Sequence, residues 1–159
     1  MTQRWIDRLI VFAATGCGSG LVPKAPGTAG SLVGLFLALG LFGLGEMAAA
    51  VLIAVFLPAA VVIADKAEKH LQKTDPGCIV IDEIAGMLIT LFGIPLSAGT
   101  AVGGFILFRI FDITKPFPIR YLERRIPGGA GIVADDLAAG IYANLLLRIA
   151  LALWGAGVG

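Results

Sequence analysis

The chain has 159 residues, of which 58% are hydrophobic and only 14% are charged, and its formal net charge is +1. This length suits one domain with a substantial core, and so low a charged fraction points toward contact with lipid. The near-zero net charge excludes the basic footprint of a nucleic-acid-binding protein and the acidic tail of a charge-driven binding module, so no nucleic-acid partner is expected.

An amphipathic helix is expected over residues 1–14, where Trp5, Ile6 and Leu9 recur at helical spacing. Such a helix can lie on a membrane surface.

The next stretch, TGCGSGLVPKAPGTAGS, covers residues 15–31 and is rich in Gly, Pro and Ser, so it is expected to be irregular. It carries the hydroxyls of Ser19 and Thr28 and places Lys24 just before a helix, which makes it a candidate anion-binding loop. It lacks the Gly-Lys-Ser/Thr ending of a nucleotide-binding P-loop, and a plain flexible loop is the alternative.

Two helical hairpins are expected over residues 32–64 and 79–115, separated by a polar segment, and a last helix over residues 135–155. Alternating strand patterns are scarce, and Ala, Leu and Gly dominate these segments. The sequence therefore predicts an all-α fold over residues 1–159: one compact bundle of about six helices, with Gly/Pro-rich loops at the active site.

The basic residues are distributed unevenly between the two ends of the expected hairpins. Their tips, near residues 43–46 and 93–100, carry no Lys or Arg, whereas the opposite loops carry most of them. By the positive-inside tendency, the basic loops face the cytoplasm and the bundle is partly embedded in the membrane. A crossing needs about 20 apolar residues, and residues 84–92 fall well short of that. A soluble bundle with an unusually apolar core is therefore the alternative.

Paired carboxylates stand at the head of two apolar segments, Asp82 with Glu83 and Asp135 with Asp136. The helix dipole stabilises acids in a first turn, which accounts for one acid in each pair. It does not account for the second acid, or for Asp112 on a third apolar helix, because buried carboxylates are costly unless paired or bound to metal. An all-oxygen site of this kind suits Mg²⁺, so the two pairs are the predicted metal ligands.

Cationic and amide side chains accompany these acids. Arg109, Asp112 and Lys115 lie three residues apart among apolar neighbours, which indicates a cavity where Arg and Lys meet phosphate oxygens. A surface ladder of ion pairs is the alternative. Asn144 lies two helical turns after Asp136, on the same predicted face, and could orient a phosphate or a metal-bound water.

Four sequence blocks occur in the order GSGLVPKAPGTAGS, DPGCIVIDEIAGM, FRIFDITKPFPIR and GGAGIVADDLAAGIYAN. Together they closely resemble phosphatidylglycerophosphatase A, from about residue 15 to residue 145. The resemblance implies a magnesium-dependent phosphatase of the bacterial inner membrane, with its active site on the cytoplasmic side. Its expected substrate is the phospholipid phosphatidylglycerophosphate, which it would hydrolyse to phosphatidylglycerol and phosphate.

The residue patterns and the resemblance meet in one hypothesis. The catalytic residues are Asp82, Glu83, Asp112 and Asp136, and Asp112 is a further metal ligand, a proton-accepting base or a covalent nucleophile. The predicted substrate-binding residues are Ser19, Lys24, Thr28, Arg109, Lys115 and Asn144.

The competing function is a small membrane transporter that uses buried carboxylates as a proton or cation relay. Against it, a cation pathway gains nothing from the neighbouring Lys and Arg. The sequence makes no prediction of the oligomeric state.

Overall fold

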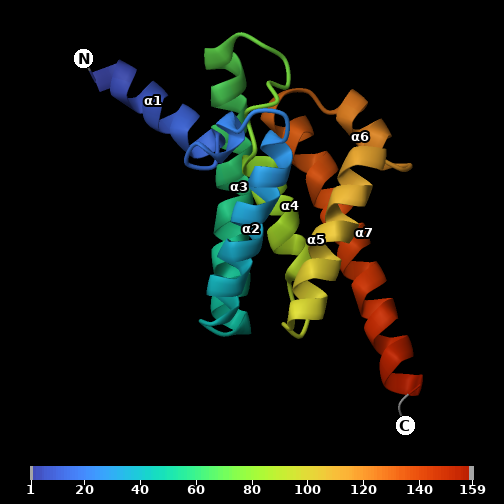
Figure 1. Ribbon diagram of the computed structural model, residues 1–159. Helices are drawn as coiled ribbons and strands as arrows, with labels where there is room; N and C mark the ends of the chain where they lie inside the picture. Colours follow the sequence, from blue (N-terminus) through green and yellow to red (C-terminus); the bar gives the residue numbers. More distant parts are fainter. Residues whose placement is uncertain (1, 158–159) are drawn as a thin grey trace.

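The computed structural model describes residues 2–157, which form a bundle of seven α-helices and one short 3₁₀ helix, without a strand in that range (Figure 1). This confirms the predicted all-α fold. The elements are α1 (Thr2–Ala14), η1 (Ser19–Leu21), α2 (Pro26–Phe42), α3 (Glu46–Leu71), α4 (Ile81–Leu91), α5 (Ala98–Thr114), α6 (Ile119–Arg125) and α7 (Gly128–Gly157).

Helix α4 is the centre of the bundle. It packs against α2, α3, α5 and α7, and nine of its 11 residues are buried. A helix with apolar residues on all sides has to be surrounded by other helices, because each of its faces would be unfavourable in contact with water. Its first turn nevertheless carries Asp82 and Glu83, so the bundle holds two carboxylates near its core.

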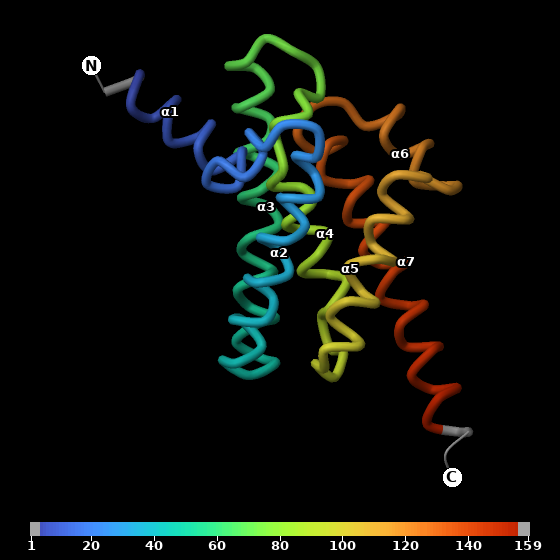
Figure 2. Tube along the Cα trace, in the orientation of Figure 1, coloured from blue at the N-terminus to red at the C-terminus, as the bar shows by residue number. Residues whose placement is uncertain are grey.

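The two ends of the bundle differ in character. The turns that follow α2 and α4 lie together at one end, whereas α6 and the polar segment between α3 and α4 lie at the other (Figures 1 and 2). The first turn of α4 and the basic segments therefore share one end, called here the charged end.

Helix α7 begins at Gly128, whereas the sequence predicts a last helix from residue 135. The glycine-rich segment looks like a loop, but these glycines serve a close helix contact. A Cβ on Gly129 would lie 2.3 Å from the Val61 carbonyl oxygen and 2.4 Å from the Asp65 nitrogen of α3. As a result, Asp135 and Asp136 lie about two turns inside α7. The helix dipole stabilises acids only in the first turn, so it does not account for either of these carboxylates.

Helix α2 also begins earlier than predicted, at Pro26, because proline suits the first helical position. Thr28 therefore lies in the first turn of α2 and not in an irregular loop. Helix α6 is a further addition, since it forms within a segment that the sequence predicts as a connection.

Two helices are long and apolar enough to cross a membrane by length and composition: α3 (Glu46–Leu71) and the part of α7 over Gly128–Gly155. Only 22% of the most apolar window of each is buried inside the bundle. Most residues of these windows are therefore not buried by the protein itself, which favours membrane association over the core of a soluble protein.

Candidate active site

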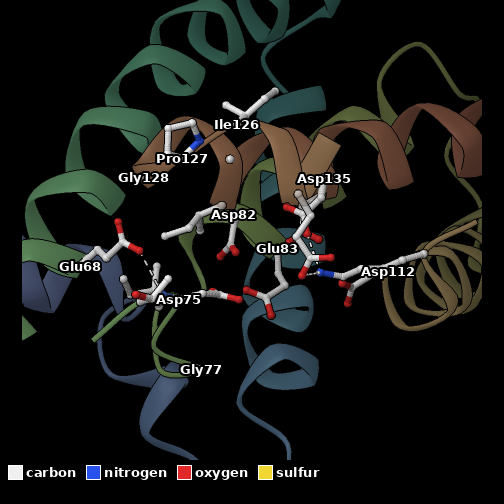
Figure 3. Close-up of a pocket in the computed structure, with 17 residues that line it drawn as sticks. Glu68, Asp75, Gly77, Asp82, Glu83, Asp112, Ile126, Pro127, Gly128 and Asp135 are labelled. Carbon is white, nitrogen blue, oxygen red and sulfur yellow. Dashed lines mark hydrogen bonds and ion pairs between the residues drawn. The ribbon is translucent and has the colours of Figure 1, made fainter. Parts of the chain in front are cut away.

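A cavity of about 300 Å³ opens at the charged end (Figure 3). Within the described range 2–157, its lining contains eight carboxylates and one cation, Lys115. The carboxylates belong to Glu68, Asp75, Asp82, Glu83, Asp112, Glu123, Asp135 and Asp136. We call this hollow the acidic cavity. So dense a negative charge repels an anionic ligand unless cations or protons offset it.

Three of these carboxylates form a compact group: Asp82, Glu83 and Asp136 each offer an oxygen within 4.8 Å of the others. Helices α4 and α7 bring them together at a glycine crossing. A Cβ on Gly140 would lie 2.4 Å from the Gly86 carbonyl oxygen, so only glycine permits this approach. Asp82 and Asp136 each lie one helical turn before these glycines, on helices that run side by side in the same direction (Figure 1).

The compact group is poorly satisfied by protein groups. Burial raises the pKa of the Asp82 carboxyl well above its usual value, and the neighbouring Glu83 adds to this. Burial also raises the pKa of Glu83. Asp82 Oδ1, Glu83 Oε2 and Asp135 Oδ1 are buried without a hydrogen-bond partner. A buried oxygen without a hydrogen-bond partner lowers the stability of the fold, and carboxylate oxygens are the preferred ligands of hard divalent cations. The residues therefore fit a metal ion.

Asp135 lies beside the compact group and is bound to Lys115. The Lys115 ammonium lies 2.6 Å from Asp135 Oδ2 and 2.8 Å from Glu123 Oε1. Burial opposes its charged form, but the two carboxylates outweigh burial and raise the pKa of Lys115 above its usual value. Lys115, which directly follows α5, thus stays charged and links α6 to α7 at the rim of the acidic cavity.

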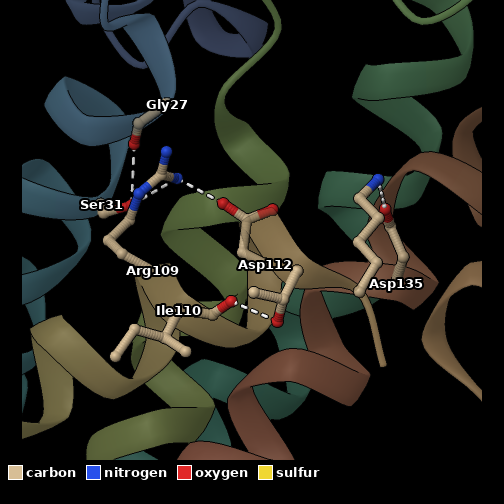
Figure 4. Close-up of polar contacts among 8 residues, drawn as sticks. Gly27, Ser31, Arg109, Ile110, Asp112 and Asp135 are labelled. Carbon is tan, nitrogen blue, oxygen red and sulfur yellow. Dashed lines mark hydrogen bonds and ion pairs between the residues drawn. The ribbon is translucent and has the colours of Figure 1, made fainter. Parts of the chain in front are cut away.

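Arg109 does not line the cavity itself but holds Asp112, which does (Figure 4). Its Nη1 donates to Asp112 Oδ2 and, at 3.4 Å, to Ser31 Oγ. The Ser31 hydroxyl in turn donates to the Gly27 carbonyl oxygen at 2.7 Å. A Cβ on Gly27 would lie 2.3 Å from Glu83 Oε1 and 3.0 Å from Arg109 Nη1. The first turn of α2 therefore packs directly against both side chains, and a larger residue there would displace them.

The family model described as phosphatidylglycerophosphatase A matches residues 12–151. The chain belongs to the phosphatidylglycerophosphatase A family. This confirms the resemblance drawn from the four sequence blocks, and it makes the chain an enzyme of the phosphoric monoester hydrolase class.

Three curated relatives extend along most of the chain. "Phosphatidylglycerophosphatase A" of Haemophilus influenzae is 41% identical over 147 residues, which cover 91% of this chain and 90% of that protein. The protein of the same name in Escherichia coli is 38% identical over 153 residues, or 91% and 85%. A Bacteroides thetaiotaomicron protein provisionally named as a phosphatidylinositol-3-phosphatase is 38% identical over 150 residues, or 89% and 93%. No solved structure matches the chain at a significant level.

Most of the residues predicted for a phosphatidylglycerophosphatase site meet in the structure. The acidic cavity is lined by Asp82, Glu83, Asp112, Lys115, Asp135 and Asp136. Arg109 contacts this set through Asp112. The metal-ligand prediction treats the acid pairs equally, whereas in the structure Asp136 joins the compact group and Asp135 pairs with Lys115.

The predicted residues of the Gly/Pro-rich segment lie outside this lining. The Ser19 hydroxyl donates to the Thr15 carbonyl oxygen at 3.4 Å, within its own loop. Lys24 is exposed. Thr28 is half-buried in the first turn of α2, next to Gly27. The contacts of this segment with the side chains around the cavity come from Gly27, which lies against Glu83 and Arg109, and from Ser31, whose Oγ accepts from Arg109.

Asn144 lies at the other end of α4. Its amide nitrogen donates to the carbonyl oxygens of Ile89, Thr90 and Phe92, at 3.1, 3.0 and 2.9 Å. Its side-chain oxygen accepts from Arg148 Nε at 2.8 Å. These contacts complete the C-terminus of a buried helix, so we do not assign Asn144 to the site of this phosphatase family member.

Three carboxylates of the lining escaped the sequence analysis: Glu68, Asp75 and Glu123. Glu68 lies in the last turns of α3 and Asp75 in the polar segment that follows, where Glu68 Oε1 accepts from the Asp75 backbone nitrogen at 3.1 Å. Their only signal was proximity in sequence to the Asp82–Glu83 pair, and polarity of that kind is also typical of a solvated loop. Glu123 lies among arginines on α6, so its sequence context is typical of a surface ion pair and gives no indication of a cavity.

Proposed function

We propose that the enzyme hydrolyses the terminal phosphomonoester of phosphatidylglycerophosphate, to give phosphatidylglycerol and phosphate, and that it depends on Mg²⁺. The family assignment and the names of two relatives support the substrate. The observation that carries the metal dependence is the compact group of three carboxylates, of which Asp82 and Asp136 are buried and Glu83 is half-buried. Two of its oxygens lack a partner, and the cavity around it is strongly negative.

The proposed ligands of Mg²⁺ are Asp82, Glu83 and Asp136, because only these three converge closely enough among the described residues. A phosphate monoester carries up to two negative charges, so the acidic cavity by itself repels its own substrate. When bound, Mg²⁺ supplies charge compensation for the phosphoryl oxygens and lowers the pKa of water.

The chain's own residues complete the reaction. Asp112 is proposed as the base, because it lines the cavity while Arg109 holds one of its oxygens. The water oxygen forms a bond to phosphorus, the bond from phosphorus to the glycerol oxygen breaks, and the water proton passes to Asp112. The leaving glycerol oxygen takes a proton from solvent. Lys115 donates to a phosphoryl oxygen from the rim.

The lipid substrate also accounts for the outer surface. The exposed apolar sides of α3 and α7 suit acyl chains, and the basic segments gather at the charged end, where phospholipid head groups lie. We therefore place the enzyme in the bacterial inner membrane, with the acidic cavity on the cytoplasmic side.

The test is phosphate release by the purified enzyme in detergent micelles. Phosphatidylglycerophosphate with Mg²⁺ is compared with the same sample plus a chelator, and then with excess Mg²⁺ restored. Soluble glycerol phosphate and phosphatidylinositol 3-phosphate serve as comparison substrates, the latter because of the provisional name of one relative. We expect Mg²⁺-dependent release that is fastest from phosphatidylglycerophosphate. Preference for the inositol lipid would reject the substrate, and full activity in chelator would reject the metal.

A further inference from the structure

A second hollow of about 370 Å³ lies beside α6, at the same end of the bundle as the acidic cavity. Within residues 2–157, its lining comprises three cations, two aromatic residues and one threonine, without a carboxylate. These residues are Thr114, Lys115, Phe117, Arg120, Tyr121 and Arg124. We call it the basic groove. It shares Lys115 with the acidic cavity, so two hollows of opposite charge meet at one side chain.

The arginines of the basic groove are available to a ligand. Arg120 and Arg124 lie four residues apart on α6 and so share one face of that helix. Both are exposed, and among the residues that the structure describes neither has a carboxylate partner. By contrast, Arg109 is paired with Asp112. Paired guanidinium N–H donors at this spacing match the oxygens of a phosphate group.

An apolar stripe leads away from the basic groove along α5. Its members are Val102, Ile106, Ile110 and Ile113, which recur at three- and four-residue spacing, followed by Phe117 after the helix. All five side chains are exposed, and Phe117 is 82% exposed although it also lines the groove. Cationic groups above a continuous apolar strip have the arrangement that a phospholipid requires, with its phosphate above its acyl chains.

We propose that the basic groove binds the phosphodiester of the lipid substrate, with an acyl chain along the α5 stripe and the terminal monoester in the acidic cavity. This inference rests on the proposed function, since it assigns the second phosphate of that substrate. A phosphodiester is a permanent anion and would be repelled by the carboxylates of the acidic cavity, so it needs a separate site. The glycerol unit between the two phosphates would pass over Lys115, which belongs to both linings. Selection for a lipid with two phosphates follows from this division.

The experiment compares the unsubstituted enzyme, the double variant Arg120→Gln/Arg124→Gln and the single variant Arg125→Gln. Arg125 is the next residue on α6, but its guanidinium lies over the Tyr121 ring, 5.2 Å from the centroid, and it does not line the groove. All three enzymes are assayed in mixed micelles of one composition, with phosphatidylglycerophosphate as substrate. Phosphatidylglycerol, which keeps only the diester, and inorganic phosphate, which resembles only the monoester product, serve as inhibitors.

We expect the double variant to lose about 10- to 100-fold in kcat/KM, as for loss of hydrogen bonds to a charged group. Inhibition by phosphatidylglycerol should weaken by a similar factor, whereas inhibition by inorganic phosphate and all constants of Arg125→Gln should change less than about twofold.

Equal losses in the double variant and in Arg125→Gln would overturn the inference, because general attraction to the micelle would explain both. An unchanged inhibition by phosphatidylglycerol would overturn it as well, even if the enzyme hydrolyses its substrate with Mg²⁺. Absence of phosphate release by the unsubstituted enzyme would instead reject the proposed function, and this inference with it.

Discussion

The two ends of α4 both carry polar groups inside an apolar bundle, but only one end is satisfied by the protein. At the C-terminal end, the carbonyl oxygens of Ile89, Thr90 and Phe92 accept hydrogen bonds from Asn144. At the N-terminal end, Asp82 and Glu83 each keep a buried oxygen without a partner. The satisfied end is complete as a structural cap, whereas the unsatisfied end requires a ligand. Substitutions at the first should therefore change stability, and those at the second should change catalysis.

The largest effect is expected for Asp82→Asn and Asp136→Asn. Each removes a charged ligand from the compact group, so kcat should fall on the order of 10³-fold and Mg²⁺ affinity should fall with it. The helical circular-dichroism spectrum should be unchanged. Glu46→Gln is the control, because Glu46 lies at the opposite end of the bundle, beside Gly93. Retained activity in both aspartate variants would contradict the metal site.

Asp112→Asn separates proton transfer from metal binding. Loss of the proposed base should lower kcat by about 10²-fold, the lower range for general-base catalysis. The Mg²⁺ concentration for half-maximal activity should stay the same, because Asp112 lies outside the compact group. A large increase in that concentration would show that Asp112 is a metal ligand.

Gly27→Ala tests how closely α2 supports the unsatisfied end. The new Cβ would lie 2.3 Å from Glu83 Oε1, so the Glu83 carboxylate has to move, and kcat should fall about 10-fold. Gly40→Ala, in the same helix, is the matched control, since a Cβ there meets nothing within 4 Å. Equal activity of the two variants would show that the position of Glu83 does not matter.

Asn144→Ala addresses the satisfied end. It leaves the Thr90 carbonyl oxygen without its side-chain donor and removes one of the donors to the Ile89 and Phe92 carbonyl oxygens, which should lower the free energy of unfolding by about 1–3 kcal/mol. The kcat of the folded enzyme should change less than about twofold, since Asn144 is remote from the cavity. Thermal unfolding in detergent measures the first and phosphate release the second, with the exposed Leu145→Ala as control. A loss of kcat without a loss of stability would show that Asn144 acts in the active site and not as a structural cap of α4.

The smallest effect is a pH dependence of stability in the metal-free protein. Burial raises the pKa of Asp82 and Glu83, so the folded chain binds protons more tightly than the unfolded chain does. The free energy of unfolding should therefore fall as pH rises from about 5 to 7. Tm should fall with it, by about 2–4 °C for each kcal/mol of unfolding free energy that is lost. Mg²⁺ should reverse this fall at pH 7, and Asp82→Asn should flatten it. A Tm of the metal-free protein that increases over this pH range would contradict the raised pKa values.

Local patterns predicted the helices well, because apolar periodicity reflects contacts that every buried helix must make. They were wrong about the start of α7, where Gly129 suggests a loop. That glycine is required by the contact with α3, which lies far away in sequence. They also placed Asn144 with Asp136 because the two share a helix face. Two helical turns amount to about 11 Å, enough to reach the opposite end of α4.

By itself, the sequence determined that carboxylates would lie inside an apolar bundle together with Arg and Lys, since apolar helices leave their acids little contact with water. Only the tertiary structure decided that Asp136 joins Asp82 and Glu83 while Asp135 pairs with Lys115. Adjacent residues of a helix point about 100° apart, so this choice depends on how α7 is rotated about its axis. The close crossing of α4 and α7 at Gly86 and Gly140 determines that rotation.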